Sequence, residues 1–204
     1  MFTGIIRAVG SVINSDMSGD LMRLTVTSPA GFSSGLSGGE SVAVDGVCLT
    51  IVSAEGDELT FDVIQESLTL STLGEVKTGL KLNLERSLKF GDEVGGHILS
   101  GHISCTCEIV GLVSDEGVHD LRLQVDDEWM RYILEKGFIA IDGISLTVGQ
   151  TDSETGTFDV HLIPETLERT TILGKVVGDH LNIEFDSQTV ATVDTIERMQ
   201  GVNQ

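Results

Sequence analysis

Two short segments of the chain place small polar side chains at matching positions. VDGVCLT occupies residues 44–50 and IDGISLT occupies residues 141–147, so Cys48 and Ser145 are equivalent. Thr147 follows Ser145 by two residues, and residues two apart on a strand lie on the same face. The second segment therefore presents a pair of hydroxyl groups to one side of a predicted strand.

His102 is a candidate for proton transfer, because a neutral imidazole is the usual side-chain base near neutral pH. It lies in SGHIS, where the first half of the chain has Ile5 in TGIIR. A buried structural histidine is the alternative interpretation of any single histidine. The difference from Ile5 favours a function, because a purely structural position more often keeps the aliphatic residue.

Other chemical motifs lack support in the sequence. Cys105 and Cys107 form a Cys-x-Cys with no second ligand pair to close a zinc site, so buried small residues are predicted there. His97 precedes His102 by an odd spacing that, on a strand, points the two rings to opposite faces, so we expect no metal site. Neither a phosphate-binding G-x-x-x-x-G-K loop nor a Ser-His-Asp motif context is present.

The chain contains an internal repeat with a shift of 97 positions. The matched pairs include Gly4 and Gly101, Ala43 and Ala140, Asp45 and Asp142, and the FDV of residues 61–63 and 158–160. After a two-residue insertion the match resumes, and LNLE in the first copy matches LNIE in the second. Two long copies predict a duplicated domain rather than a solenoid array.

Each copy has the pattern of short strands. The segments LMRLTVTSP, SVAVDGVCLTIV, ELTFDVI and KLNLER are rich in Val, Ile, Leu and Thr and are separated by turn signals, which predicts a small closed barrel. A short capped helix is predicted within DDEWMRYILEKG, residues 126–137. The tail has Val190, Val193, Ile196 and Met199 at every third position, which predicts an apolar-striped helix. Either its own barrels or another subunit must bury that stripe, and we favour another subunit.

Composition limits the partners and the location. The formal net charge of −20, from 12 basic and 32 acidic residues, disfavours nucleic acid and anionic membranes as partners. The charge does not distinguish a salt-tolerant source from an ordinary acidic protein. No stretch approaches the roughly 20 apolar residues of a membrane span, and MFTGIIRAVG is not a signal peptide. A cytoplasmic location is therefore predicted. The three cysteines are an odd number, so no disulfide framework is expected.

Several motifs together resemble riboflavin synthase of the alpha-subunit type, a family built from two lumazine-binding repeats. They are MFTGII, the paired DGVCLT and DGISLT, ERSLKFGDEVGGHILSGHI, and HLIPETLERTTILG. The resemblance covers the chain from Met1 to the tail. It implies an all-β fold of two tandem homologous six-stranded Greek-key barrels plus a C-terminal α-helix. The implied domains are barrels at 1–97 and 98–187 and an oligomerisation helix at 188–204.

The resemblance also implies a transferase reaction. Two molecules of 6,7-dimethyl-8-ribityllumazine exchange a four-carbon unit, which gives riboflavin and 5-amino-6-(D-ribitylamino)uracil without a metal or a separate cofactor. The implied assembly is a homotrimer, and association with lumazine synthase is open. A duplicated pocket could hold both reacting molecules in register. The alternative is a non-catalytic antenna protein that binds lumazine or flavin on the same scaffold, and the retained polar side chains favour the enzyme.

The resemblance implies a set of reacting residues: His102, Ser145, Thr147, Cys48 and Asp186. Cys48 is either a nucleophile or part of a pocket wall. Lys136 and Asp186 match site positions of the family, or serve only as charges at helix ends. Phe2 and Ser41 also match family positions, and both packing and ligand contact are open for them.

By resemblance, the substrate would occupy two pockets. The first would be lined by Gly4, Ile5, Ile6, Cys48, Leu49, Thr50, Asp62, Val63, Ile64, Gln65, Glu66 and Ser67. The second would be lined by Gly101, His102, Ile103, Lys136, Ser145, Leu146, Thr147, His161, Leu162, Ile163, Pro164, Glu165 and Thr166. Ser67 stands where the family usually has threonine, so a hydroxyl is retained and only a methyl contact differs.

Overall fold

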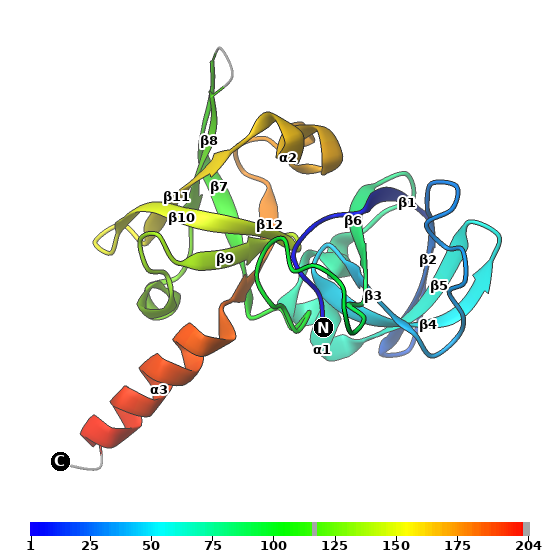
Figure 1. The fold of residues 1–204 in the computed structure, drawn as a ribbon, viewed down its shortest axis with the longest axis horizontal. Helices are drawn as coiled ribbons and strands as arrows, with labels where there is room; N and C mark the ends of the chain where they lie inside the picture. Colours follow the sequence, from blue (N-terminus) through cyan, green and yellow to red (C-terminus); the bar gives the residue numbers. More distant parts are fainter. Residues whose placement is uncertain (116–117, 202–204) are drawn as a thin grey trace.

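The computed structural model describes residues 1–115 and 118–201. It consists of two closed six-stranded antiparallel barrels and a C-terminal helix, which confirms the predicted fold class (Figure 1). The predicted helix of residues 188–204 ends with three residues that lie outside the described range.

The two barrels repeat one topology. The strands of the first are β1 (Ala8–Ser18), β2 (Leu21–Thr27), β3 (Ser41–Val44), β4 (Val47–Glu55), β5 (Glu58–Ile64) and β6 (Lys81–Arg86). The strands of the second are β7 (Cys105–Asp115), β8 (Val118–Gln124), β9 (Phe138–Ile141), β10 (Ile144–Asp152), β11 (Thr157–Leu162) and β12 (His180–Phe185). The order β1-β2-β5-β4-β3-β6 recurs as β7-β8-β11-β10-β9-β12. The sequence repeat is therefore a repeat of the whole barrel.

Short helices connect the later strands of each barrel. They are α1 (Gln65–Leu70) and η1 (Thr72–Glu75) in the first, and α2 (Pro164–Arg169) and η3 (Ile172–Gly174) in the second. These helices are too short to show a helical period in the sequence and were not predicted. The helix predicted within residues 126–137 is shorter than expected and of the 3-10 type, η2 (Asp127–Tyr132), because the backbone is already extended at Ile133.

Each barrel has its own apolar core, but one residue of each core comes from the other copy. Ile6, which precedes β1, belongs to the core of the second barrel. Ile103, which precedes β7, packs against the core of the first barrel. We call residues 2–6 and 99–103 the crossing segments. They run side by side between the barrels and pair through Phe2 and Leu99, whose N–H groups donate to each other's carbonyl oxygens at 2.8 and 3.0 Å (Figure 1).

The repeated Asp-Gly sequence forms the turn of a hairpin in both barrels. Asp45 and Gly46 have φ of 44° and 83°, and Asp142 and Gly143 have φ of 45° and 77°. Two successive positive φ values are typical of the type I′ turn that joins tightly paired strands. The two turns touch, since a methyl group on Gly46 would lie 2.8 Å from the backbone nitrogen of Gly143. Glycine is therefore required by both the turn and the contact.

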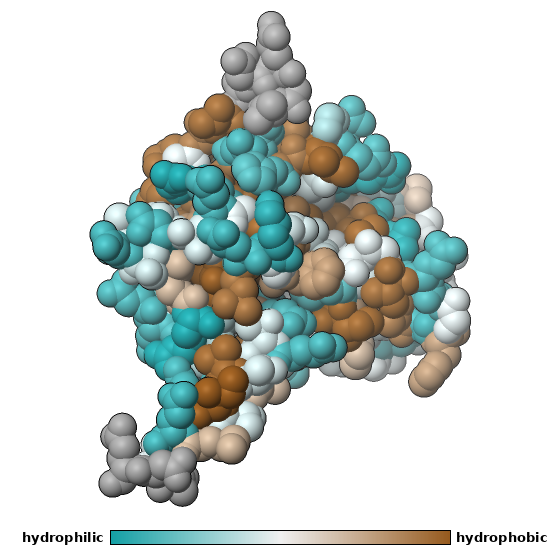
Figure 2. Space-filling model, turned by 60° about the vertical axis from the view of Figure 1, so that its left-hand side comes forward, coloured by the Kyte–Doolittle hydropathy of each residue, from teal (hydrophilic) through white to brown (hydrophobic). Residues whose placement is uncertain are grey.

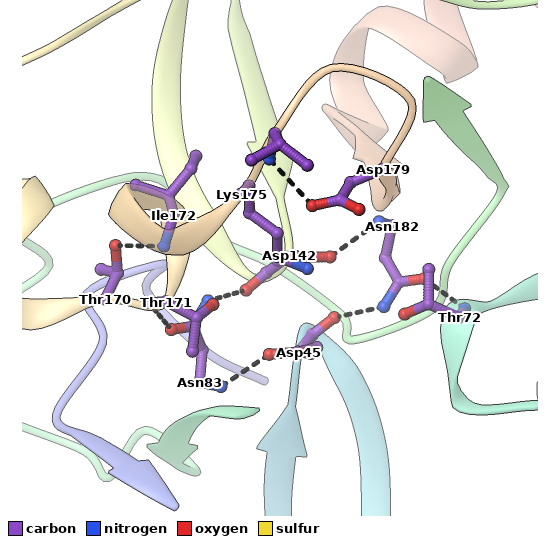
Figure 3. A network of polar contacts seen from close by, with 11 residues as sticks. Asp45, Thr72, Asn83, Asp142, Thr170, Thr171, Ile172, Lys175, Asp179 and Asn182 are labelled. Carbon is purple, nitrogen blue, oxygen red and sulfur yellow. Dashed lines mark hydrogen bonds and ion pairs between the residues drawn. The ribbon is translucent and has the colours of Figure 1, made fainter. Parts of the chain in front are cut away.

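Two buried asparagines bond across this contact. Asn83 donates from Nδ2 to the carbonyl of Asp142 at 3.0 Å, and Asn182 donates to the carbonyl of Asp45 at 2.9 Å (Figure 3). Their Oδ1 atoms accept from backbone N–H groups beside η3 and η1. We call these two asparagines and the two Asp-Gly turns the latch. Its reciprocal contacts are those of an approximate twofold axis between the barrels.

Lys175 breaks the symmetry of the latch. Its Nζ lies 3.2 Å from Oδ2 of Asp142, whereas Val76 occupies the equivalent place after η1. Burial raises the pKa of the Asp45 carboxyl, and the neighbouring Asp142 adds to this rise while Lys175 opposes it. Burial also raises the pKa of Asp142, again against the effect of Lys175. One cation therefore compensates two buried acids.

The C-terminal helix, α3 (Ser187–Gly201), projects from the second barrel (Figure 1). Val190 packs against the core of that barrel, and the Tyr132 hydroxyl of η2 donates to Asp194 at 2.6 Å. The chain's own second barrel therefore covers the start of the apolar stripe, which we had expected another subunit to bury. Further along the helix, Ile196 is 50% exposed.

Lys175→Met should lower the free energy of unfolding by about 3 kcal/mol near neutral pH, because two buried carboxyls lose their cation. Their pKa values are raised in the folded state, so the native protein binds more protons than the unfolded chain and stability falls as pH rises. The substitution raises both pKa values further, and the loss should be larger near pH ~8 than near pH ~5. Urea unfolding at both values measures it.

The matched control is Lys77→Met at an exposed lysine, which should change the free energy of unfolding by less than about 0.5 kcal/mol at either pH. Equal losses for Lys175→Met at both pH values would contradict the assigned role of the lysine.

Candidate functional site

Two buried glutamates fix the crossing segments to the barrels. Glu85 at the end of β6 accepts from the backbone N–H and the hydroxyl of Thr3, both at 2.7 Å, and from the N–H of Gly4 at 3.0 Å. Glu184 in β12 makes the same three bonds to Ser100 and to the residue after it. Burial raises the pKa of both carboxyls, and these hydrogen bonds oppose the rise. Each glutamate thereby sets where a crossing segment leaves its own barrel.

Each crossing segment then contacts the polar residue of the opposite copy. The carbonyl of Gly4 accepts from the N–H of Ser145 at 2.9 Å, and the carbonyl of Gly101 accepts from the N–H of Cys48 at 2.8 Å. A methyl group on Gly101 would lie 2.5 Å from Cβ of Cys48, and one on Gly4 would lie 2.5 Å from Cβ of Ser145. Cys48 and Ser145 therefore face segments that come from the other half of the chain.

A cavity of about 450 Å³ lies where the second crossing segment meets the first barrel. Its lining is Val47, Cys48, Ile64, Glu66, Ser67, Leu70, Ser71, Gly101, His102 and Ile103. Gly4, Ile5 and Ile6, which were predicted for the first pocket, do not line this cavity, because the crossing segments exchange between the barrels. A larger cavity of about 650 Å³ lies beside the latch, but none of the predicted site residues lines it.

The structure separates the predicted cluster of His102, Ser145 and Thr147. His102 is exposed and lines the same cavity as Cys48. Among the described residues, no hydrogen bond joins His102 to either hydroxyl of the second barrel. Within one chain, His102 therefore lies with Cys48 of the first barrel rather than with the two hydroxyls of the second.

Ser145 and Thr147 share the outer face of β10, as their spacing predicts. They alternate with buried Ile144, Leu146 and Val148. The reciprocal contacts make Ser145 the counterpart of Cys48, so this face of the second barrel is the counterpart of the cavity in the first. We call the cavity beside Cys48 in the first barrel the first face. We call the surface of the second barrel that carries Ser145 and Thr147 the second face.

His97 is a residue of the second face that the sequence did not reveal. Its Nδ1 lies 2.7 Å from Oγ of Ser145, and its ring stacks on Phe138 with centroids 5.0 Å apart and planes 14° apart. Burial lowers the pKa of His97, and the charge of Asp186 opposes this. Asp186 is also the cap of α3, where its Oδ2 accepts from the N–H and the hydroxyl of Thr189 at 2.9 Å each.

The remaining predicted residues of the first copy are spread between the core and the surface. Phe2 is 1% exposed and packs between the barrels with Leu99, Ala43, Ala140 and Cys48, which is a packing position. Leu49 and Val63 lie in the first core, and Asp62 pairs with Arg23 at 2.9 Å on the outer surface. Ser41 begins β3 opposite Thr50, and Gln65 begins α1.

The predicted residues of the second copy are divided in the same way. Leu146 and Leu162 are core residues, whereas Lys136, Ile163, Pro164 and Glu165 are exposed and Thr166 is half-buried. Lys136 has φ of 65° and follows η2. Glu165 contacts Arg169 on α2, and His161 pairs with Asp120 at 2.7 Å. The paired positions of the first copy, Leu21 and Ile64, are apolar, so this contact has no counterpart there.

Cys107 belongs to the second core and Cys105 packs against it, as predicted for buried small residues. Burial raises the pKa of Cys107 and raises that of Cys105 to about 12. In the described part of the chain, no three His, Cys, Asp or Glu side chains are placed to hold a metal ion. None of the described helices has the length and apolar character needed to cross a membrane.

Comparison with known proteins gives the family. Residues 3–87 and 100–186 each match the lumazine binding domain. The chain is 45% identical to riboflavin synthase of Escherichia coli (strain K12) over 200 residues, which is 98% of this chain and 93% of the relative. It is 46% identical to riboflavin synthase of Chlamydia pneumoniae over 199 residues, 98% of this chain and 96% of the relative. The chain belongs to the riboflavin synthase family.

Solved structures show the same fold. LumP complexed with 6,7-dimethyl-8-(1'-D-ribityl) lumazine has a TM-score of 0.83 at 22% identity and covers 92% of this chain and 100% of its own. LumP complexed with riboflavin has a TM-score of 0.83 at 26% identity over the same shares. The resemblance to the riboflavin synthase family, inferred from the motifs, is confirmed by the identity over nearly the full chain.

Gly101→Ala should destabilise the fold more than Gly91→Ala. Both glycines have positive φ, 83° and 95°, so alanine is strained at both by about 1 kcal/mol. Only Gly101 has a side chain within clashing distance, so its substitution should cost a further ~2 kcal/mol from overpacking against Cys48. Thermal unfolding of the two variants measures the difference. Equal losses would mean that the crossing segment does not depend on close contact with the first barrel.

Proposed function

We propose that this chain is a transferase that converts two molecules of 6,7-dimethyl-8-ribityllumazine into riboflavin and 5-amino-6-(D-ribitylamino)uracil. The observation that carries this conclusion is the 45% identity to a riboflavin synthase over 98% of the chain, with both lumazine binding domains present. A four-carbon unit passes from one lumazine to the other. The reaction therefore needs two binding places for the same molecule, and the chain has two equivalent faces.

The size and shape of the first face suit one such ligand. Its cavity of about 450 Å³ lies within the range of small-molecule pockets, which is roughly 300–1,000 Å³. Exposed Ile64 offers an apolar surface for a flat ring, and Glu66 and Ser67 at the start of α1 offer polar partners for ribityl hydroxyls. Binding two rings in register would supply up to about 7–11 kcal/mol of the barrier by positioning alone.

We assign the reacting groups as the sequence predicted them. His102 takes the proton from the methyl group at ring carbon 7 of lumazine, and the hydroxyls of Ser145 and Thr147 lie beside the resulting anion. Cys48 lines the first cavity as a nucleophile or as a wall. Asp186 is the remaining predicted group, and its negative charge acts on His97. The neutral imidazole and the hydroxyls together supply proton transfer near neutral pH without a metal.

A complete site under this proposal needs two chains, because His102 and Ser145 lie on different faces of one chain. We propose a homotrimer in which the first face of one subunit meets the second face of the next. Helix α3 supports this arrangement, since apolar surface continues along one side of the projecting helix (Figure 2). A cytoplasmic location and association with lumazine synthase stay predictions from the sequence.

His102→Gln should lower the turnover of 6,7-dimethyl-8-ribityllumazine by about 10²-fold, as expected for loss of a positioned base. The assay follows riboflavin fluorescence after the chain is incubated with the lumazine alone. His180→Gln, at an exposed histidine outside the cavity of the first face, should stay within about twofold of the parent.

Two results would contradict the assignments. Near-normal turnover of His102→Gln would remove this residue from the chemistry. A parent chain that forms a stable complex with the lumazine and yields no riboflavin would be a binding protein on the same scaffold as LumP, and the proposed reaction would be wrong.

Ile196→Lys should shift the assembly towards a single chain of 21.8 kDa and make specific activity fall on dilution, because each site needs two chains. The control is Thr195→Lys, which adds the same charge at an exposed neighbouring position of α3 and should keep the parent mass. Light scattering and assays across a dilution series measure both effects. A dissociated variant with undiminished specific activity would refute the shared site.

A further inference from the structure

The stretch between the two barrels occurs once in the chain, so its contacts are not repeated on both faces. It contacts the second face. A methyl group on Gly96 would lie 2.6 Å from Cβ of Ser145, and Nδ1 of His97 lies 2.7 Å from its Oγ. At the first face, no histidine ring is hydrogen-bonded to the thiol of Cys48 among the described residues. The two faces therefore differ at the side chain that is Cys48 in one and Ser145 in the other.

We propose that His97 is a positioning residue that holds the Ser145 hydroxyl in one orientation and so distinguishes the second face from the first. This inference rests on the proposed function, in which one lumazine gives up the four-carbon unit and the other accepts it. A serine hydroxyl rotates about its C–O bond, and a fixed partner decides where its hydrogen and lone pairs point. His97 supplies that partner.

The surroundings hold the ring itself in place. His97 is 7% exposed, and its ring stacks on Phe138 with planes 14° apart. Stacking of two rings at this separation resists rotation of either. The Ser145 hydroxyl is therefore bonded to a buried ring that packing restricts.

The hydrogen-bond inventory of His97 favours this role over a purely structural one. Its Nε2 is buried and has no hydrogen-bond partner among the described residues, which costs about 1–3 kcal/mol. A phenylalanine could stack on Phe138 without that cost. The single hydrogen bond of the ring, to Ser145, is what an imidazole adds at this position. Burial lowers the pKa of His97, which favours the neutral ring, and the charge of Asp186 opposes this.

The experiment compares turnover in four variants of the full chain: His97→Phe, His97→Asn, Ser145→Ala, and the double variant His97→Phe/Ser145→Ala. His97→Phe keeps the stacked ring and removes the hydrogen bond, so kcat should fall by about tenfold or more. His97→Asn can place an amide atom near the Nδ1 position, and kcat should recover to within about threefold of the parent. The double variant should be no slower than Ser145→Ala, because His97 acts through that hydroxyl.

His119→Phe is the control for loss of a buried imidazole. His119 is 5% exposed and its Nε2 also has no hydrogen-bond partner within the described part of the chain, but it lies in β8 and does not contact Ser145. The unfolding temperature of His119→Phe gives the baseline for loss of a buried imidazole, and the kcat of this variant should stay within about twofold of the parent. Should His97→Phe not fold, His97→Gln takes its place, because its longer amide reaches the Nε2 position and leaves Ser145 without its partner.

Each outcome decides the proposal. A double variant that is slower than Ser145→Ala by the full His97→Phe factor would show that the two residues act independently. His97→Asn as slow as His97→Phe, or His97→Phe as fast as the parent, would also overturn the inference. A parent chain that forms no riboflavin overturns the proposed function and this inference together, whereas an active parent with unaffected variants overturns this inference alone.

Discussion

The contact between the two Asp-Gly turns is the constraint on which the rest of the structure depends. Gly46 and Gly143 approach so closely that no side chain fits between them, and Asn83 and Asn182 bond across the same contact. Hydrogen bonds buried in this way have no water to replace a missing partner, so they specify one arrangement of the barrels. That arrangement brings the crossing segments within reach of the opposite barrel, where they build the two faces.

Exchange of the crossing segments makes each face a joint product of both copies. Glu85 and Glu184 hold the exchanged segments, and each buried carboxylate receives three hydrogen bonds in return for its lost hydration. Ile6 and Ile103 then fill the core of the barrel they cross to. The barrels are therefore separate closed sheets whose cores each include a residue of the other copy.

Local patterns in the sequence predicted the parts of the structure that local chemistry decides. Period-two alternation and turn residues gave the barrels, and the spacing of Ser145 and Thr147 gave their shared outer face. The exchange was not predictable, because periodicity says that a residue is buried but not which barrel buries it. The repeated LNLE and LNIE did carry a signal of the contact between the barrels, because each places an Asn and a Glu at matching positions of an apolar strand. His97 has no counterpart, so comparison of the copies could not reveal it.

A scaffold with exact twofold symmetry would treat two identical substrates identically, yet the proposed reaction makes one a donor and the other an acceptor. Asymmetry must therefore come from residues without an equivalent partner. Lys175, which stands at the position equivalent to Val76, is one such residue, but it lies beside the latch and acts on Asp45 of one copy and Asp142 of the other. The connection between the barrels is better placed, because it exists once and contacts Ser145 of the second face through Gly96 and His97. Duplication within a single chain supplies such a connection without any change to the barrels. Two separate copies of one barrel would lack it.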